Sequence, residues 1–190
     1  MSIPLNEVAY SIAGAIRLAR FDTGGLDHFG DSTEAFWKSF WAAVLIAPFF
    51  FLLLLLRHGE TTTGLAFLHN VFLELLAYAV SWLAFPVVMA ALSRSLNCEL
   101  EYVRYIVAYN WCGVIQNGIY LPIAILGFIG VLSGALANLL ALVAIGWVLV
   151  YTYFVTRSAL GVTGGTAMGI VFMDLMLGIV IDLISSRFLI

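Results

Sequence analysis

Five long apolar stretches, separated by short polar segments, account for most of this chain. They cover residues 36–56, 65–92, 102–126, 132–155 and 166–187. Because a helix of about 20 apolar residues crosses the hydrocarbon core of a bilayer, each stretch is long enough to span a membrane. We therefore predict an all-α fold in which residues 36–190 form a polytopic transmembrane helical bundle of five spans.

Residues 1–35 follow a different pattern, and we treat them as a separate unit. Apolar residues recur there at helical spacing, while polar residues such as Arg17 and Arg20 occupy the opposite face. This pattern predicts an N-terminal amphipathic helix that lies in the membrane interface, with a helix that caps the bundle as the alternative. A polar connector follows; its acidic residues could gather a cation, but a solvated loop explains them more simply, so we predict no metal site. The apolar face consists of Leu5, Val8, Ile12, Ala15, Ile16 and Ala19.

Polar residues recur at helical spacing inside the predicted spans. In the last span, Asp174, Gly178, Asp182 and Ser186 follow one another every four residues and therefore share one face. An aspartate near the centre of a span costs up to about 3 kcal/mol on insertion scales, so this face should point into the bundle. The second span carries a similar stripe of Asn70, Glu74, Ala77 and Ser81. We predict an intramembrane polar cluster made of His69, Asn70, Glu74, Asn110, Gln116, Asn117, Asp174 and Asp182.

Glycines form a further pattern around the fourth and fifth spans. Glycine lets two helix backbones approach closely, and membrane helices use such positions at their contacts. We therefore predict helix-packing positions at Gly130, Gly134, Gly165, Gly169 and Gly178.

Composition supports the membrane interpretation. Of the 190 residues, 63% are hydrophobic and only 10% are charged, whereas soluble domains carry about 25% charged residues. The chain could not cover a water-exposed surface, so its first partner is the lipid bilayer. A net charge of −3 without a basic run gives no footprint for nucleic acid. The two cysteines, Cys98 and Cys112, show no metal-type spacing, and we expect no cofactor.

Lysine and arginine residues predict the orientation of the spans. Positively charged residues remain on the cytoplasmic side of membrane proteins. This rule predicts a cytoplasmic N-terminus and, after five spans, a C-terminus on the other side, which is the periplasm for a bacterial inner-membrane protein. One side carries Arg17, Arg20, Lys38, Arg94, Arg104 and Arg157, and the other carries Arg57 and Arg187.

The intramembrane acids leave two interpretations open. Ionisable groups at this depth commonly mark a proton or cation path. Alternatively, the same residues hold helices together through hydrogen bonds to Asn, Gln, Tyr and Ser side chains. A catalytic carboxylate pair is not expected, because Asp174 and Asp182 would lie about 12 Å apart along one helix. The sequence also lacks Gly-x-Ser-x-Gly and His-Glu-x-x-His motifs, so we predict that the protein is not an enzyme.

The layout resembles the bacterial branch of the Yip1 domain family. The resemblance is carried by the segment Gly-Ala-Ile-Arg-Leu-Ala-Arg-Phe-Asp at residues 14–22, by an aromatic-rich first span, and by five predicted spans in 190 residues. It implies a non-enzymatic role in organising membranes or binding partners, such as other membrane proteins or further copies of the chain. The alternative function is a small proton- or cation-coupled transporter, channel or accessory subunit that uses Glu74, Asp174 and Asp182.

Overall fold

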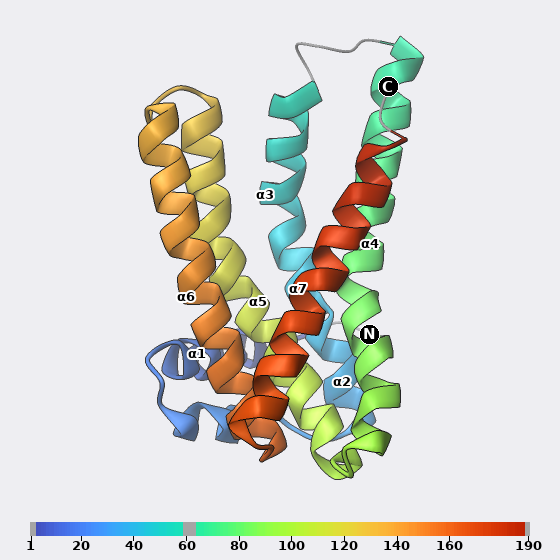
Figure 1. Ribbon diagram of the computed structural model, residues 1–190, viewed down its shortest axis with the longest axis vertical. Helices are drawn as coiled ribbons and strands as arrows, with labels where there is room; N and C mark the ends of the chain where they lie inside the picture. Colours follow the sequence, from blue (N-terminus) through green and yellow to red (C-terminus); the bar gives the residue numbers. More distant parts are fainter. Residues whose placement is uncertain (1–2, 59–63, 189–190) are drawn as a thin grey trace.

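The computed structural model describes residues 3–58 and 64–188, and over these residues the fold is helical without a strand. Figure 1 shows the long helices side by side, with the two short N-terminal helices and the 3₁₀ helix at one end. This confirms the predicted all-α class. The elements in chain order are α1 (Leu5–Ala19), η1 (Thr23–His28), α2 (Thr33–Ser39), α3 (Trp41–His58), α4 (Gly64–Ser95), α5 (Glu99–Phe128), α6 (Gly134–Leu160) and α7 (Gly164–Ser186).

Within the described residues, five helical segments are long and apolar enough to cross a membrane. This confirms the five predicted spans. Each segment extends past its predicted apolar stretch at one end at least, and the first three do so at both ends, because backbone hydrogen bonds continue the helices into the flanking residues. The segments are Thr33–Arg57, which joins α2 and α3, Gly64–Ser95, Glu99–Phe128, Gly134–Leu160 and Gly164–Ser186.

Local sequence signals set several helix ends. Side-chain oxygens of Ser32, Ser133 and Thr163 accept hydrogen bonds from backbone N–H groups in the first turns of α2, α6 and α7. Such caps satisfy donors that the helix itself leaves without an acceptor. At the other end of α6, Gly161 adopts a φ of 64°, a left-handed conformation that glycine tolerates best.

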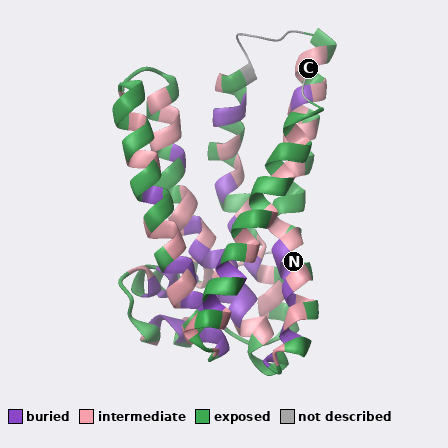
Figure 2. Ribbon diagram, in the orientation of Figure 1, coloured by how far each residue is buried: buried purple, intermediate pink, exposed green. Residues whose placement is uncertain are grey.

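Helix α5 is the centre of the bundle. It packs against α1, α2, α3, α4 and α6, whereas α7 packs mainly against α4 and α6. Residues 105–112 of this helix are buried except for the half-buried Tyr109, and they include Tyr105, Ile106, Trp111 and Cys112. Figure 2 shows that buried residues gather in the half of the bundle nearest α1 and α2, while the opposite half is mostly exposed. We call these the capped half and the open half.

Helix α1 covers part of the capped half. Its buried face consists of Ser11, Gly14, Ala15 and Leu18, and the Tyr151 hydroxyl of α6 donates a hydrogen bond of 2.7 Å to the Ala15 carbonyl. The predicted apolar face therefore contributes only partly to this contact: Leu5 and Ile16 are 86% and 39% exposed. Small residues make the contact because they let α1 lie close to its neighbours. An interfacial position of the exposed face stays a prediction.

Two further contacts fix this N-terminal cap. A Cβ atom on Gly25 of η1 would lie 2.6 Å from the Gly14 carbonyl oxygen, so the two backbones touch where only glycine fits. The Arg104 guanidinium of α5 donates two hydrogen bonds, of 2.8 and 3.2 Å, to the Leu26 carbonyl of η1. The capped half is thus held by backbone contact and by polar bonds to the central helix.

Candidate functional site

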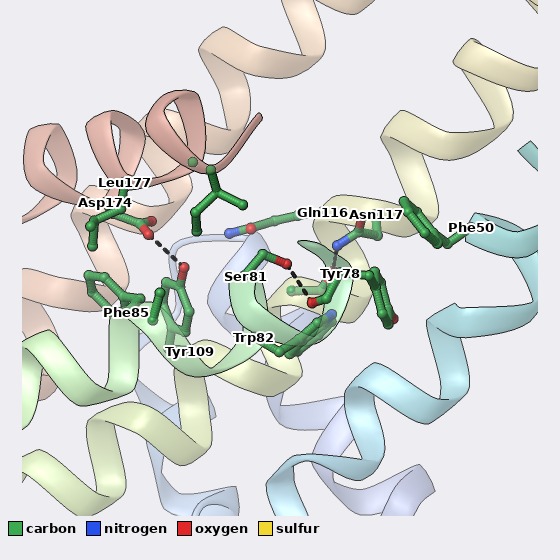
Figure 3. Close-up of a pocket in the computed structure, with 14 residues that line it drawn as sticks. Phe50, Tyr78, Ser81, Trp82, Phe85, Tyr109, Gln116, Asn117, Asp174 and Leu177 are labelled. Carbon is green, nitrogen blue, oxygen red and sulfur yellow. Dashed lines mark hydrogen bonds between the residues drawn. The ribbon is translucent and has the colours of Figure 1, made fainter. Parts of the chain in front are cut away.

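Helices α3, α4, α5 and α7 line an open cavity of about 310 Å³, which we call the inner cavity. Figure 3 shows aromatic and polar side chains from all four helices around it. The residues that line this cavity include Phe50 of α3, Tyr78, Ser81, Trp82 and Phe85 of α4, Tyr109, Gln116 and Asn117 of α5, and Asp174 of α7.

A second cavity of about 200 Å³ adjoins the first on the side of the open half, and we call it the outer cavity. Both cavities are lined by Ser81 of α4 and Gly178 of α7, and the outer one adds the carboxylates of Glu74 and Asp182. Ser185 also lines it, and the buried hydroxyl oxygen of this residue has no hydrogen-bond partner among the described residues. The two cavities together form one polar groove between α4 and α7.

Asp174 is the carboxylate of the inner cavity. The Tyr109 hydroxyl donates a hydrogen bond of 2.9 Å to its Oδ1 atom, linking α5 to α7 (Figure 3). The Asp174 side chain is half-buried, whereas Asp182 in the outer cavity is exposed in the isolated chain. The two acids therefore differ in environment although they lie on the same stripe of α7.

The hydroxyl donors around the inner cavity, and one N–H of each amide, are used within the protein. The hydroxyls of Tyr78 and Ser81 donate to the carbonyls of Ala43 and Tyr78, at 2.6 and 2.8 Å. The amide groups of Asn117 and Gln116 donate to the Gly113 carbonyl and to the Thr152 hydroxyl, at 2.9 and 3.0 Å. The hydroxyl groups are therefore left with oxygen lone pairs, whereas each amide keeps its oxygen and a second N–H.

Aromatic rings form two walls of the inner cavity. Phe50 stacks on Tyr78 with a centroid distance of 4.5 Å, and Phe85 stacks on Tyr109 at 4.3 Å. Trp82 meets Tyr78 edge-on at 6.2 Å. Stacking of this kind keeps large rings in defined positions, so the cavity has rigid apolar walls beside its carboxylate.

The predicted polar cluster is only partly brought together. Gln116, Asn117 and Asp174 line the inner cavity, and Glu74 and Asp182 line the outer one. Three residues lie elsewhere. Asn110 is fully buried against α2, where its amide donates to the Ser39 hydroxyl at 2.8 Å, and His69 and Asn70 lie on α4 but are not among the residues that line either cavity.

The predicted glycine contacts do not occur within one copy of the chain. A Cβ atom added at any of the five glycines predicted to pack helices would meet no heavy atom within 4 Å, because the neighbouring helices lie too far away there. Close approach occurs instead at Gly14 and Gly25, and at Gly127, where a Cβ would lie 2.9 Å from Ala137. The five open positions are Gly130, Gly134, Gly165, Gly169 and Gly178, the last of which borders both cavities.

Sequence reasoning missed the aromatic walls. On α5, Tyr109, Gly113 and Gln116 share a face, and on α4 Tyr78 and Phe85 are seven residues apart, which is two helical turns. This spacing was a usable signal. Aromatic residues occur throughout the chain, however, and the same spacing also fits ordinary core packing or a lipid-facing surface.

The described residues contain no group of three or more side chains that could hold a metal ion. Comparisons of the chain with protein-family models, with curated proteins and with solved structures gave no match.

Proposed function

We propose that this chain is a non-enzymatic, multi-pass membrane protein of Yip1-like type that binds or organises other membrane components through the groove. Its five long apolar helices are compatible with an integral membrane protein. The observation that carries the proposal is the contrast between a tightly packed capped half and a groove in which carboxylates line open cavities.

The use of polar side chains in the two halves supports a binding role. Two buried polar pairs join helices in the capped half: Tyr105 with Thr156 at 3.0 Å, and Asn110 with Ser39 at 2.8 Å. Such pairs hold a membrane bundle together. In the groove, Asp182 is exposed and lines the outer cavity, while Asp174 borders the inner cavity with one of its oxygens bonded to Tyr109. Ionisable groups at membrane depth that line a cavity commonly serve function.

We further propose that the protein resides in a bacterial inner membrane, with a cytoplasmic N-terminus and a periplasmic C-terminus. The distribution of basic residues supports this orientation. Arg17, Lys38, Arg94, Arg104 and Arg157 belong to helix segments near the capped end (Figure 1), which the positive-inside rule assigns to the cytoplasm. Reporter fusions at each terminus test the orientation: activity of a periplasmic reporter at the N-terminus would refute it.

Filling the groove tests the binding role. The variant Gly178→Leu adds a side chain where both cavities meet, and Gly169→Leu adds the same side chain at an open position of the same helix. A photoreactive amino acid at position 81 in native membranes should give a discrete adduct that Gly178→Leu abolishes and Gly169→Leu preserves. An adduct that survives groove filling, or that also forms from the exposed position 142, would refute the proposal.

The second candidate function is a proton- or cation-coupled transporter, channel or accessory subunit. One observation favours it: Glu74, Asp174 and Asp182 line two adjoining cavities instead of lying apart. Purified protein in proteoliposomes should then carry a proton or alkali-cation flux that Asp174→Asn and Asp182→Asn each reduce. A flux equal to that of empty liposomes, or one unchanged in both variants, would exclude this candidate.

A further inference from the structure

We propose that the inner cavity binds an organic ammonium ion, with aromatic rings around its alkyl groups and the Asp174 carboxylate as its counter-ion. The inference rests on the proposed binding role of the groove and names the class of ligand that the groove takes. It draws on three independent features of the cavity, namely its aromatic walls, its charge and its hydrogen-bonding pattern.

The aromatic walls match what an alkylated cation requires. A cation over the face of an aromatic ring, within about 6 Å of the centroid, is attracted by the ring quadrupole, and quaternary ammonium groups are recognised in this way. The inner cavity offers the stacked pairs Phe50–Tyr78 and Phe85–Tyr109, with Trp82 beside them. Its volume of about 310 Å³ lies at the lower end of the range for small-molecule sites, about 300–1,000 Å³.

The charge of the inner cavity is negative. Asp174 is the one carboxylic acid among the residues that line it, and these residues include no lysine, arginine or histidine. Away from water a charge interacts more strongly with an opposite charge, because the local dielectric constant is lower. The adjoining outer cavity carries the acids Glu74 and Asp182. An entering cation thus meets negative groups along the groove before it reaches Asp174.

The hydrogen-bonding pattern favours a cation over an anion. The hydroxyls of Tyr78, Ser81 and Tyr109 donate to acceptors within the protein, as does one N–H of each amide of Gln116 and Asn117. A carboxylate or phosphate entering the cavity would face the Asp174 carboxylate and lose its hydration, and no lysine, arginine or histidine lines the cavity to replace it. An ammonium ion gains acceptors if it carries N–H groups, and needs no hydrogen bonds if it is fully alkylated.

The ammonium group could belong to a free amine in water or to the headgroup of a bilayer lipid. The chemistry at Asp174 is the same in both cases, and the experiment separates them. In one arm, the full-length protein is purified in a nonionic detergent and sodium phosphate buffer, since amine buffers would compete. Binding is then measured by calorimetry with choline and with 3,3-dimethyl-1-butanol, its uncharged isostere. In the other arm, lipids with choline or ethanolamine headgroups are quantified after controlled delipidation.

In the free-amine arm, choline should bind roughly tenfold or more tightly than the uncharged isostere. Asp174→Asn should remove this difference, whereas Glu99→Gln, a change of an exposed acid at the start of α5, should preserve it. In the lipid arm, the wild type and Glu99→Gln should retain one tightly held ammonium-headgroup lipid that Asp174→Asn releases. If Asp174→Asn does not fold, Gly178→Leu, which blocks the cavity without touching the carboxylate, takes its place.

Equal affinity for choline and its isostere in the first arm, together with no headgroup selectivity in the second, would overturn the proposal. Binding that persists in Asp174→Asn and in Gly178→Leu would also overturn it. Either result leaves the groove-dependent adduct from position 81 to be judged by itself. The ammonium site and the binding role can therefore fail separately.

Discussion

Removing the hydroxyl of Tyr151 should loosen α1 from the bundle while the transmembrane helices stay folded. The Tyr151 hydroxyl donates to the Ala15 carbonyl at 2.7 Å, and both residues have no exposed surface. In Tyr151→Phe the ring remains, the bond between α6 and α1 is lost, and so is the interaction of the hydroxyl with the Cys112 thiol of α5. A buried neutral hydrogen bond contributes about 0.5–1.5 kcal/mol net. The equilibrium for detaching α1 should therefore rise about fivefold, within a range of roughly 2- to 13-fold.

Limited trypsin digestion in detergent measures this detachment. Arg17 and Arg20 of the α1 region are near the surface and become cleavable when the helix detaches. At low protease concentration the cleavage rate follows the population of the detached form, so the rate should rise by the same factor.

The matched control is Tyr105→Phe. It removes an equally buried hydroxyl, whose bond of 3.0 Å to Thr156 joins α5 and α6 instead of α1. This variant should lower the thermal stability of the whole protein but leave the cleavage of α1 nearly unchanged. Wild-type cleavage of Tyr151→Phe, or equal acceleration in both variants, would refute the reasoning.

Three further predictions concern the packing of the capped half. Gly25→Ala should lower the midpoint of thermal unfolding, because the new Cβ would lie 2.6 Å from a backbone oxygen of α1 and the forced shift costs about 1–3 kcal/mol. Ser39→Ala should destabilise the protein by about 1–3 kcal/mol because it removes the acceptor of a buried Asn110 N–H, and adding Asn110→Leu should recover part of the loss. The hydrogen bond from Arg17 lowers the pKa of Asp22 below 3.8, so the pair stabilises the fold above that pKa and is lost as the pH falls through the lowered value. The stability difference between wild type and Asp22→Asn should thus be constant near neutral pH and vanish in strong acid.

The first of these predictions has a control in the chain. Gly165→Ala changes an exposed glycine whose Cβ would meet no heavy atom within 4 Å, and it should leave the unfolding midpoint unchanged or raise it slightly. An equal loss in Gly25→Ala and Gly165→Ala would contradict the close contact between η1 and α1. A double change at Ser39 and Asn110 that is no better than Ser39→Ala would contradict the paired bond. A stability difference for Asp22→Asn that grows as the pH falls would contradict the predicted sign.

The spans and the two facing stripes were predictable because both depend on local patterns. The length of an apolar run decides whether a helix can cross a bilayer. A polar stripe in such a helix avoids lipid whatever its neighbours are. Hence Ser81 of α4 and Asp182 of α7, which the sequence assigned to polar stripes, do line the shared groove.

Helix neighbours were not predictable in the same way. The spacing of Asn110 and Asn117 gives them one face of α5, yet Asn110 contacts α2 whereas Asn117 borders the inner cavity. Which helix lies opposite each turn depends on crossing angles and on side chains far away in sequence. The same holds for glycines: Gly169 allows a close approach, but no helix of the same chain takes that position.

The most direct test of the central claim is the accessibility of cysteines placed on and off the groove. In a background without Cys98 and Cys112, cysteine replaces Ser81, Gly178 or the outward-facing Leu142, one at a time. The rate of modification by a membrane-impermeant trimethylammonium thiol reagent is then measured in intact membranes. A polar groove predicts that positions 81 and 178 react several-fold faster than position 142. Groove positions that react no faster than position 142 would contradict the account.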